Sequence, residues 1–456
     1  MAESESTAAT TWRFPAAFWT ANFIELFERA AFYGTYITLV VFLSEVVGFT
    51  DVEAGWIGAL FSGGIYFLPF VTGAAADRMG FRYALALAFA LLTVGYGTLS
   101  MLPTKLPVLG ALGLVVVGGA FIKGIITGTV AQTSDSANRA RAYSLFYMMV
   151  NIGSFTGKTI ARPVRVELGL DQVPLYSAGA ALIALLVTLA FYWPKGNGEE
   201  RPKTALESLR GMATVMSNMR FLSLILITGG FWIIQVQMYA SMPKYVLRLV
   251  GPGASPEWYA NVNPAIVVLL VVPITQLVRK MSPVASIAIS LGLITISPLV
   301  MASSRFMSGS LEIVGQTLPA ITVAMVLGIA LQGFAECFLS PRYYEYASKQ
   351  APPGQEGLYM GYAHLSFFFS WLLGFIASGY LIDAFCPDPK TLPAADQALY
   401  QAAMAGQGAL PAAYQHAHYI WYVFAGAGLV AFILLLVFQA VTKRIDAEAN
   451  GAEAAA

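Results

Sequence analysis

The sequence contains few of the residues on which soluble enzymes depend. Of its 456 residues only 11% are charged, whereas a soluble domain carries about 25%. Hydrophobic residues make up 57% of the chain. They form continuous runs rather than alternating ones, which indicates spanning helices instead of a β-barrel. The composition therefore predicts an all-α polytopic membrane protein.

Cysteine and histidine are scarce. The chain has two cysteines, Cys337 and Cys386, and three histidines, His364, His416 and His418. They form no HExxH pair and no cysteine cluster, so the sequence predicts neither a catalytic residue nor a metal site. A glycine-rich phosphate loop is also absent, and a net charge of +1 gives no reason to expect nucleic acid. We expect neither an enzyme nor a bound cofactor.

Long apolar runs dominate the sequence instead. A spanning helix needs about 20 apolar residues, and twelve runs meet this length. A polar segment divides them six and six, which is typical of two six-helix halves. The expected spans are 15–45, 53–76, 81–103, 106–132, 138–168, 173–194, 219–249, 256–280, 283–303, 312–348, 355–385 and 414–442. The expected domains are a disordered cytoplasmic N-terminus (1–13), a first bundle (14–194), a cytoplasmic linker (195–218), a second bundle (219–445) and a disordered tail (446–456).

The distribution of Lys and Arg predicts the orientation. With the N-terminus inside, sixteen of the 26 basic residues lie in cytoplasmic segments, as the positive-inside rule requires. The N-terminal segment lacks the basic start of a signal peptide. We therefore expect a multi-pass protein of the cell (inner) membrane with both termini in the cytoplasm.

Three charges interrupt the first apolar run. Glu25, Glu28 and Arg29 occur within five residues, and helical spacing places them on one face. A charge in the middle of a spanning helix costs about 2.5–3.5 kcal/mol on insertion scales. This face must therefore contact protein or water rather than lipid, and its charges need partners elsewhere in the chain.

Two further charged residues lie inside expected spans. Lys123, in the fourth span, is the expected partner of Glu25 or Glu28, whereas Glu336, in the tenth, has no cation near it in the sequence. Together with Arg29 these charges sum to minus one, so one bound proton makes the set neutral. Such a balance is what proton-coupled transport requires, although Lys158 in the fifth span brings the sum to zero if it faces the same cavity.

Uncharged polar and aromatic residues accompany these charges in both halves. An amide in lipid is costly unless it is hydrogen-bonded, so each one either bonds to a neighbouring helix or faces a polar cavity. Their spread over both halves favours a central cavity. The candidates are Tyr33, Tyr36, Tyr66, Asn151, Gln235 and Asn263.

The segment between the second and third spans resembles a known loop signature. Residues 73–82 read GAAADRMGFR. Their Gly73, Asp77, Arg78 and Gly80 are similar to the cytoplasmic loop motif of the major facilitator superfamily. The resemblance implies the fold of that superfamily, with twelve transmembrane helices in two six-helix bundles around a central site.

Other motifs resemble the proton-dependent oligopeptide transporter (POT/PTR) family of this superfamily. Residues 25–29 (ELFER) resemble its ExxER signature, and residues 146–154 (FYMMVNIGS) resemble its second signature. Asn263-Pro264 and the stretch from Glu336 to Pro341 are similar to its patterns in spans 8 and 10. The chain is identified as an atypical, twelve-helix member of this family.

The resemblance implies a role for each candidate residue. The proton-coupling set would be Glu25, Glu28, Arg29 and Lys123. In the second half, Glu336 would receive the amino terminus of a peptide, while the cations of the first half would hold its carboxylate. The implied substrate-binding set is Arg29, Tyr33, Tyr36, Tyr66, Lys123, Asn151, Trp232, Gln235, Asn263, Glu336 and Ser340.

The chain departs from the family pattern at several positions. The resemblance predicts an acidic residue in span 7 where Val236 stands, and a tryptophan in span 11 where Ala363 and His364 stand. Gly124 replaces a proline, and the short linker excludes the two extra helices of many bacterial members. We therefore expect an altered pocket in which the acids of span 1 carry more of the proton coupling.

These observations predict a proton-coupled symporter that imports di- or tripeptides or peptide-like zwitterions by alternating access. The expected partners are that substrate, protons as the coupling ion and the lipid bilayer, and a monomer is expected to suffice. Two alternatives remain: a proton antiporter that exports drugs or amphiphilic compounds, and a non-transporting membrane sensor on the same fold. The titratable acids beside a lysine disfavour the sensor.

Overall fold

The computed structural model describes residues 13–135, 138–194, 205–307, 309–313, 315–351 and 356–455. Nearly all of the expected N-terminal segment 1–13 lies outside this part of the chain. The chain divides into two compact units. Unit 1 contains Met1–Thr35 and Leu68–Ser208, and unit 2 contains Tyr36–Phe67 and Leu209–Ala456.

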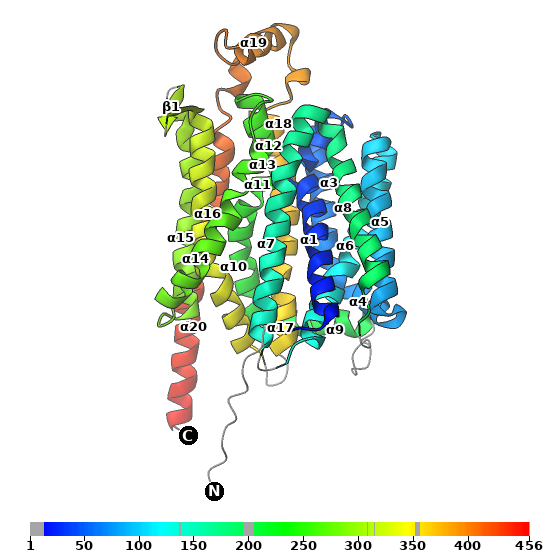
Figure 1. Cartoon of the computed structure of the whole chain (residues 1–456). Helices are drawn as coiled ribbons and strands as arrows, with labels where there is room; N and C mark the ends of the chain where they lie inside the picture. The colour runs from blue at the N-terminus through cyan, green and yellow to red at the C-terminus, as the bar shows by residue number, and fades with distance from the viewer. Residues whose placement is uncertain are drawn as a thin grey trace. The chain divides into compact units, whose positions relative to one another are not determined.

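Unit 1 is built from long apolar helices. Helix α5 packs against both α6 and α8, and Figure 1 shows these three helices next to one another. The elements of unit 1 are α1 (Ala16–Tyr36, up to Thr35), α4 (Pro69–Met79), α5 (Phe81–Met101), α6 (Lys105–Gln132), α7 (Arg139–Pro163), η1 (Val164–Leu168), η2 (Leu170–Gln172) and α8 (Val173–Phe191). Helix α9 (Ala205–Met216) crosses the boundary between the units and lies in the expected linker.

Unit 2 combines the segment 36–67 with the second half of the chain. Helix α3 packs along α18, and α15 packs along α16 and α20. Its first elements are α2 (Leu39–Glu45), α3 (Asp51–Phe67), α10 (Met219–Gln235), α11 (Gln237–Ala240), α12 (Met242–Leu249), α13 (Pro256–Tyr259), α14 (Val262–Leu277), α15 (Pro283–Ala302) and η3 (Ser303–Phe306). The others are β1 (Ser310–Ile313), β2 (Gln316–Pro319), α16 (Ala320–Lys349), α17 (Glu356–Ala363), α18 (Leu365–Phe385), η4 (Pro389–Thr391), α19 (Ala394–Met404), η5 (Ala412–Tyr414) and α20 (Tyr419–Ala455).

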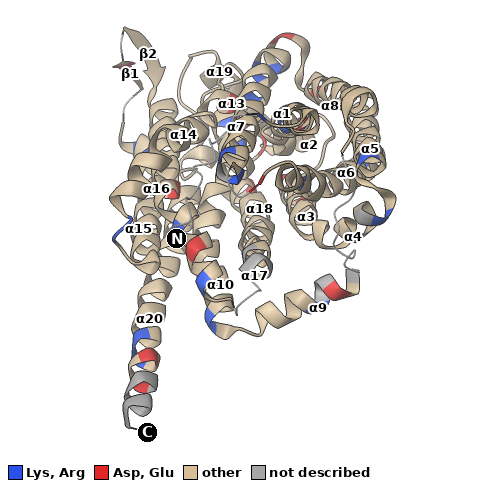
Figure 2. Ribbon diagram, turned by 60° about the horizontal axis from the view of Figure 1, so that its bottom comes forward, with Lys and Arg blue, Asp and Glu red and all other residues tan. Residues whose placement is uncertain are grey.

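The expected all-α polytopic membrane protein is confirmed. Among the described residues, ten helices are long and apolar enough to cross a membrane, and the pair α1 and α2, bent by 43°, makes an eleventh. Helix α7 has 25 residues, which is about 37 Å of helix and enough to span. Asn151 and Lys158 reduce its apolar character. Figure 2 shows how little of the helical ribbon is charged.

Five expected spans consist of two or more consecutive α-helices. The breaks lie between α1 and α2, between α3 and α4, between α10, α11 and α12, between α13 and α14, and between α17 and α18. Pro243 lies in the first turn of α12, where a proline is tolerated because its missing N–H would have no partner there. In the seventh span, hydrogen bonds still bridge the breaks: the Val236 N–H donates to the Trp232 carbonyl oxygen at 3.0 Å, and the Ser241 N–H donates to the Gln237 carbonyl oxygen at 3.1 Å.

The expected start of the tenth span at residue 312 is wrong. Ser310–Ile313 and Gln316–Pro319 instead form the antiparallel strands β1 and β2, in which Ser310 pairs with Pro319 and Ile313 with Gln316. Gly315, in the turn, has a φ of 73°, which favours glycine. Helix α16 begins at Ala320, directly after Pro319.

The tail expected to be disordered from residue 446 is helical. Helix α20 continues to Ala455, and Figure 1 shows it extending past the other helices of unit 2. Arg220 Nη2 lies 2.6 Å from Asp446 Oδ1, and Arg444 pairs with Glu448 one turn later at 2.9 Å. The bundle boundaries expected at 14–194 and 219–445 stay a prediction.

Helices α1 and α7 meet without intervening side chains. A Cβ atom placed on Gly153 would overlap the carbonyl oxygen of Leu26, and one on Gly157 would overlap that of Ala30. Two small residues four positions apart allow this approach between membrane helices. The glycine pair therefore holds the backbone of α7 against the turns of α1 that carry the predicted charges.

We expect Gly157→Ala to destabilise the protein by about 1–3 kcal/mol, because the added methyl group has to separate α1 from α7. The matched control is Gly179→Ala on α8, where a Cβ meets nothing within 4 Å. That change should be neutral or stabilising by about 0.5–1 kcal/mol. Thermal unfolding of the two purified variants measures the difference, and equal stabilities would contradict the close packing.

Candidate functional site

The three predicted charges of α1 form a buried ion-pair cluster in unit 1. Arg29 Nε lies 3.2 Å from Glu25 Oε1 and also pairs with Glu28 Oε2. The exposed fractions of Glu25, Glu28 and Arg29 are 5%, 2% and 8%. One guanidinium therefore serves two carboxylates, and the same group lies over the ring of Phe32 at 5.5 Å.

Lys123 of α6 belongs to the same electrostatic group. It is half-buried and interacts electrostatically with Arg29, Glu28 and Glu25. Two acids and two cations together make a set that is neutral when all four are ionised. Such balance is required because an uncompensated charge in a low-dielectric interior is costly.

The next turn of α1 carries an aromatic residue beside another lysine. Tyr33 follows Arg29 by four positions and is half-buried. The ammonium group of Lys158 on α7 lies 5.6 Å from the centre of the Tyr33 ring, a distance that permits a cation–π interaction. Lys158 is only 1% exposed. The side chain of Asn151, two turns earlier on α7, donates to the Tyr147 carbonyl oxygen at 2.8 Å.

The acid of the second half lies in unit 2 between two amides. Gln235 Nε2, at the end of α10, donates to Glu336 Oε2 at 2.6 Å. Asn263 Nδ2, near the start of α14, lies 3.4 Å from the same oxygen. Hydrogen bonds from neutral donors stabilise an ionised carboxylate without cancelling its charge. Ser340, one turn further along α16, is half-buried.

Three other predicted residues join an aromatic group in unit 2. The Tyr66 ring stacks on Phe367 with centroids 5.4 Å apart and meets Trp371 edge-on at 4.9 Å. Trp232 approaches Phe367 to 4.0 Å. Tyr36 stacks on Trp371 at 5.7 Å, and its hydroxyl lies 2.9 Å from Ser62 Oγ. These side chains form one continuous aromatic cluster, in which Tyr36, Trp232 and Trp371 are buried.

The predicted residues thus fall into two groups, each within one unit. Unit 1 holds Glu25, Glu28, Arg29, Tyr33, Lys123 and Asn151, and unit 2 holds Tyr36, Tyr66, Trp232, Gln235, Asn263, Glu336 and Ser340. Cationic groups therefore belong to the first group, and a carboxylate held by neutral amides belongs to the second.

The predicted loop motif joins α4 to α5. Gly73, Asp77 and Arg78 lie on α4, and Arg78 is exposed. Gly80 ends α4 and precedes α5 with a φ of 84°. A side chain at this position would be strained, since L-residues rarely adopt such a φ.

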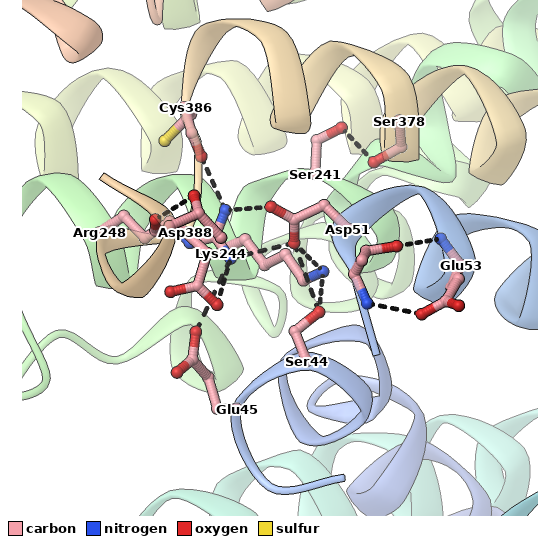
Figure 3. Close-up of polar contacts among 12 residues, drawn as sticks. Ser44, Glu45, Asp51, Glu53, Ser241, Lys244, Arg248, Ser378, Cys386 and Asp388 are labelled. Atoms are coloured by element: carbon pink, nitrogen blue, oxygen red, sulfur yellow. Dashed lines mark hydrogen bonds and ion pairs between the residues drawn. The ribbon is translucent and has the colours of Figure 1, made fainter. Parts of the chain in front are cut away.

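A second buried charged group was not predicted from the sequence. Asp51, at the start of α3, pairs with Lys244 and Arg248, which are one turn apart on α12 (Figure 3). Lys244 Nζ lies 2.6 Å from Asp51 Oδ1, and Arg248 donates to both carboxylate oxygens at 2.7 and 3.0 Å. All three residues are 4% exposed. The two-pronged contact with arginine is the strong, directional form of this interaction.

Neighbouring groups complete this cluster. Lys244 donates to Ser44 Oγ at 2.6 Å, and Arg248 donates to the Cys386 carbonyl oxygen at 2.7 Å. Arg248 Nη2 lies 3.7 Å from Glu45 and 3.9 Å from Asp388. We call the following residues the Asp51 network: Ser44, Glu45, Asp51, Lys244, Arg248 and Asp388.

The sequence did contain a signal for the Asp51 network. Lys244 and Arg248 have i,i+4 spacing in the apolar end of the seventh expected span, and two buried cations require an acid. The expected spans 15–45 and 53–76 left Asp51 in the loop between them. Val236, where the resemblance predicts an acid, is buried at 1% exposure.

The described residues include no group of three or more His, Cys, Asp or Glu side chains arranged to hold a metal ion. The clusters above instead pair acids with cations or amides. They are suited to holding charged groups of opposite sign and to exchanging protons at a paired carboxylate.

Known proteins match this chain over most of its length. A Major Facilitator Superfamily model matches residues 19–318. Multidrug resistance protein MdtH of Aeromonas salmonicida is 23% identical over 316 residues, covering 68% of this chain and 74% of the relative. Dipeptide and tripeptide permease B of Xenorhabdus bovienii is 27% identical over 192 residues, but covers only 41% of this chain and 39% of the permease.

Solved structures of peptide transporters share the fold. A structure of a proton-dependent oligopeptide transporter has a TM-score of 0.69 at 19% identity, covering 93% of this chain and 98% of that one. A peptide transporter POT in complex with sulfate has a TM-score of 0.72 at 18% identity, covering 94% and 95%. The predicted resemblance to the POT family is confirmed at the level of the fold. With a family model over most of its length and the same helical architecture, this chain belongs to the Major Facilitator Superfamily.

Proposed function

We propose that the protein is a carrier rather than an enzyme, and that it imports di- or tripeptides or peptide-like zwitterions together with protons. The observation that carries this proposal is the division of charge: cations paired with acids in unit 1, and a carboxylate held by amides in unit 2. A zwitterion has the complementary pair of charges. The peptide permeases among the relatives support the same substrate class.

The cluster around Arg29 supplies a coupling step. Arg29 is held by Glu25 and Glu28 at once, so both acids compete with any substrate carboxylate. A proton on one of these acids removes its attraction for the guanidinium. Arg29 and Lys123 then have positive charge available for the substrate. Proton binding and carboxylate binding therefore favour each other, which is the coupling that symport requires.

Glu28→Gln should lower the rate of uptake that is driven by a proton gradient by at least about tenfold, because the amide mimics a permanently protonated acid. Exchange of internal for external substrate should persist, since it needs no net proton movement. Labelled dialanine in proteoliposomes with an imposed pH gradient measures both.

The matched control for this variant is Glu312→Gln, which makes the same change at an exposed position on β1. It should transport like the wild type. Undiminished driven uptake by Glu28→Gln would contradict the coupling role of this acid.

A second candidate function is a proton antiporter that exports drugs or amphiphilic compounds. The similarity to multidrug resistance protein MdtH over 68% of the chain favours it, as does the aromatic cluster around Trp371. The two functions differ in the direction of flux. We expect an inward proton gradient to accumulate dialanine inside proteoliposomes, whereas extrusion of a loaded amphiphilic dye without peptide accumulation would establish the antiporter.

The Asp51 network has a place in the same transport cycle. It attaches α3 to α12 by buried ion pairs, and the tight contact of Gly55 with Gly379 attaches α3 to α18. In alternating access the two six-helix halves of such a carrier rock against each other. By sequence, α3 belongs to the first half, whereas α12 and α18 belong to the second. We propose that α3 separates from α12 and α18 in that step, so that the network stabilises one of the two states.

Asp51→Asn should destabilise the protein by about 3–5 kcal/mol, because Lys244 and Arg248 would keep their buried charges without a carboxylate between them. The control Glu53→Gln keeps an acceptor at an exposed position of the same helix and should change stability by less than about 0.5 kcal/mol. Thermal unfolding of the purified variants compares them. An Asp51→Asn variant as stable as wild type would contradict the network.

The location and assembly follow from the same proposal. The protein is a multi-pass membrane protein. We place it in the cell (inner) membrane, and the distribution of Lys and Arg supports an orientation with both termini in the cytoplasm. Its partners would be the peptide-like substrate, protons and the bilayer. A monomer suffices, because every proposed group comes from one chain.

A further inference from the structure

The carboxylate of Glu336 is bonded on one side only. Gln235 at 2.6 Å and Asn263 at 3.4 Å both approach Oε2. No side chain in the described part of the protein bonds to the other oxygen, Oε1. An ionised carboxylate has about four acceptor positions. Half of the group is therefore free to accept from a ligand.

The amide of Gln235 has a defined orientation. A carboxylate only accepts hydrogen bonds, so Gln235 has to present its nitrogen to Glu336, which turns its carbonyl oxygen the other way. That oxygen, Oε1, is buried and has no hydrogen-bond partner among the described residues. An unsatisfied buried carbonyl costs about 1–3 kcal/mol, so a donor from outside the chain is the expected partner.

A buried donor without a partner lies one turn away on the same helix. Trp232 precedes Gln235 by three positions on α10, which places both on one face. Trp232 is 5% exposed, and its indole nitrogen has no acceptor among the described residues. Two acceptors, Glu336 Oε1 and Gln235 Oε1, and one donor, Trp232 Nε1, thus have no partner among the described residues. Their complement is an ammonium group next to a carbonyl oxygen.

We propose that Gln235 is a specificity-determining residue that makes the Glu336 end of the site select a cation by its number of N–H donors. This inference rests on the proposed transport of peptide-like zwitterions. One N–H bonds to Glu336 Oε1 and a second to Gln235 Oε1, so primary and secondary ammonium groups satisfy both acceptors. Tertiary ammonium groups satisfy one of them, and quaternary groups satisfy neither.

A purely supporting role of Gln235 has a different consequence. If the amide only held Glu336 in position, its loss would weaken all cationic ligands by the same factor. If its carbonyl oxygen bonds to the ligand, its loss removes the distinction between ligands with two N–H donors and ligands with one. The ratio of affinities therefore separates positioning from recognition.

The test uses dialanine carrying zero, one, two or three methyl groups on its amino nitrogen, with dissociation constants measured by titration calorimetry on the purified wild-type chain. We expect the first two to bind with similar affinity and the dimethyl form to bind about tenfold more weakly, the cost of a lost bond to a charged group. The trimethyl form should bind more weakly still. Equal affinities across the series would overturn the proposal.

The variant Gln235→Met keeps the volume of the side chain but removes its polar atoms. The step between the monomethyl and dimethyl forms should shrink from about tenfold to less than about threefold. If the step persists in this variant, it arises from the size of the methyl groups, and the role of Gln235 is refuted. Trp232→Phe is the control: it should weaken all four ligands but leave the step unchanged.

The same measurements separate this inference from the proposed function. A wild-type protein that unfolds cooperatively but binds no dialanine would refute peptide transport, and the inference would fall with it. Binding of dialanine without discrimination among the methylated forms would refute the inference alone. Should Gln235→Met lose its cooperative unfolding, Gln235→Leu takes its place in the comparison, with the same expected loss of the step between the monomethyl and dimethyl forms.

Discussion

The pairing of Arg29 with two carboxylates is the interaction on which the rest of unit 1 depends. A guanidinium that is 8% exposed in a membrane helix needs compensation from its own surroundings. Glu25 and Glu28 over-compensate it by one charge, and Lys123 restores the balance. The glycines of α7 allow the backbone to close over this group. A cluster built in this way is stable only while its charges balance, and the proposed coupling to protons uses this dependence.

Unit 2 meets the same electrostatic requirement in two other ways. Glu336 has amides rather than a cation beside it, so its charge is stabilised but not cancelled. Asp51 has two cations at bonding distance, and its charge is fully compensated by them. Asp51 thus attaches one helix to another, whereas the proposed function assigns proton exchange to the acids around Arg29 and attraction of a cation to Glu336.

The sequence predicted what lies within one helix better than what lies between helices. Glu25, Glu28 and Arg29 could be grouped because i,i+3 and i,i+4 spacing places them on one face. Lys123 followed from the cost of a lone cation in a span. Asp51 and Lys244 could not be paired in this way, because an acid at the end of a helix resembles a loop residue. Gln235 could not be assigned to Glu336, since the amide of a glutamine can form hydrogen bonds with many kinds of partner. The pairing of β1 with β2 was missed because each strand has only four residues, mixed polar and apolar, which is too few for a clear pattern next to a long apolar run.

The long separation of Asp51 from its cations also bears on how the chain is made. The residue is synthesised 193 positions before Lys244, and helix α3 precedes its neighbour α18 by more than 300 residues. At about 5–20 residues per second, roughly 10 to 40 seconds pass before the first cation exists. During that interval α3 has an acid without a counter-ion at its end and glycines without a partner helix along its side. The early membrane intermediate therefore differs from the finished unit, and the burial of Asp51 is among the late events of assembly.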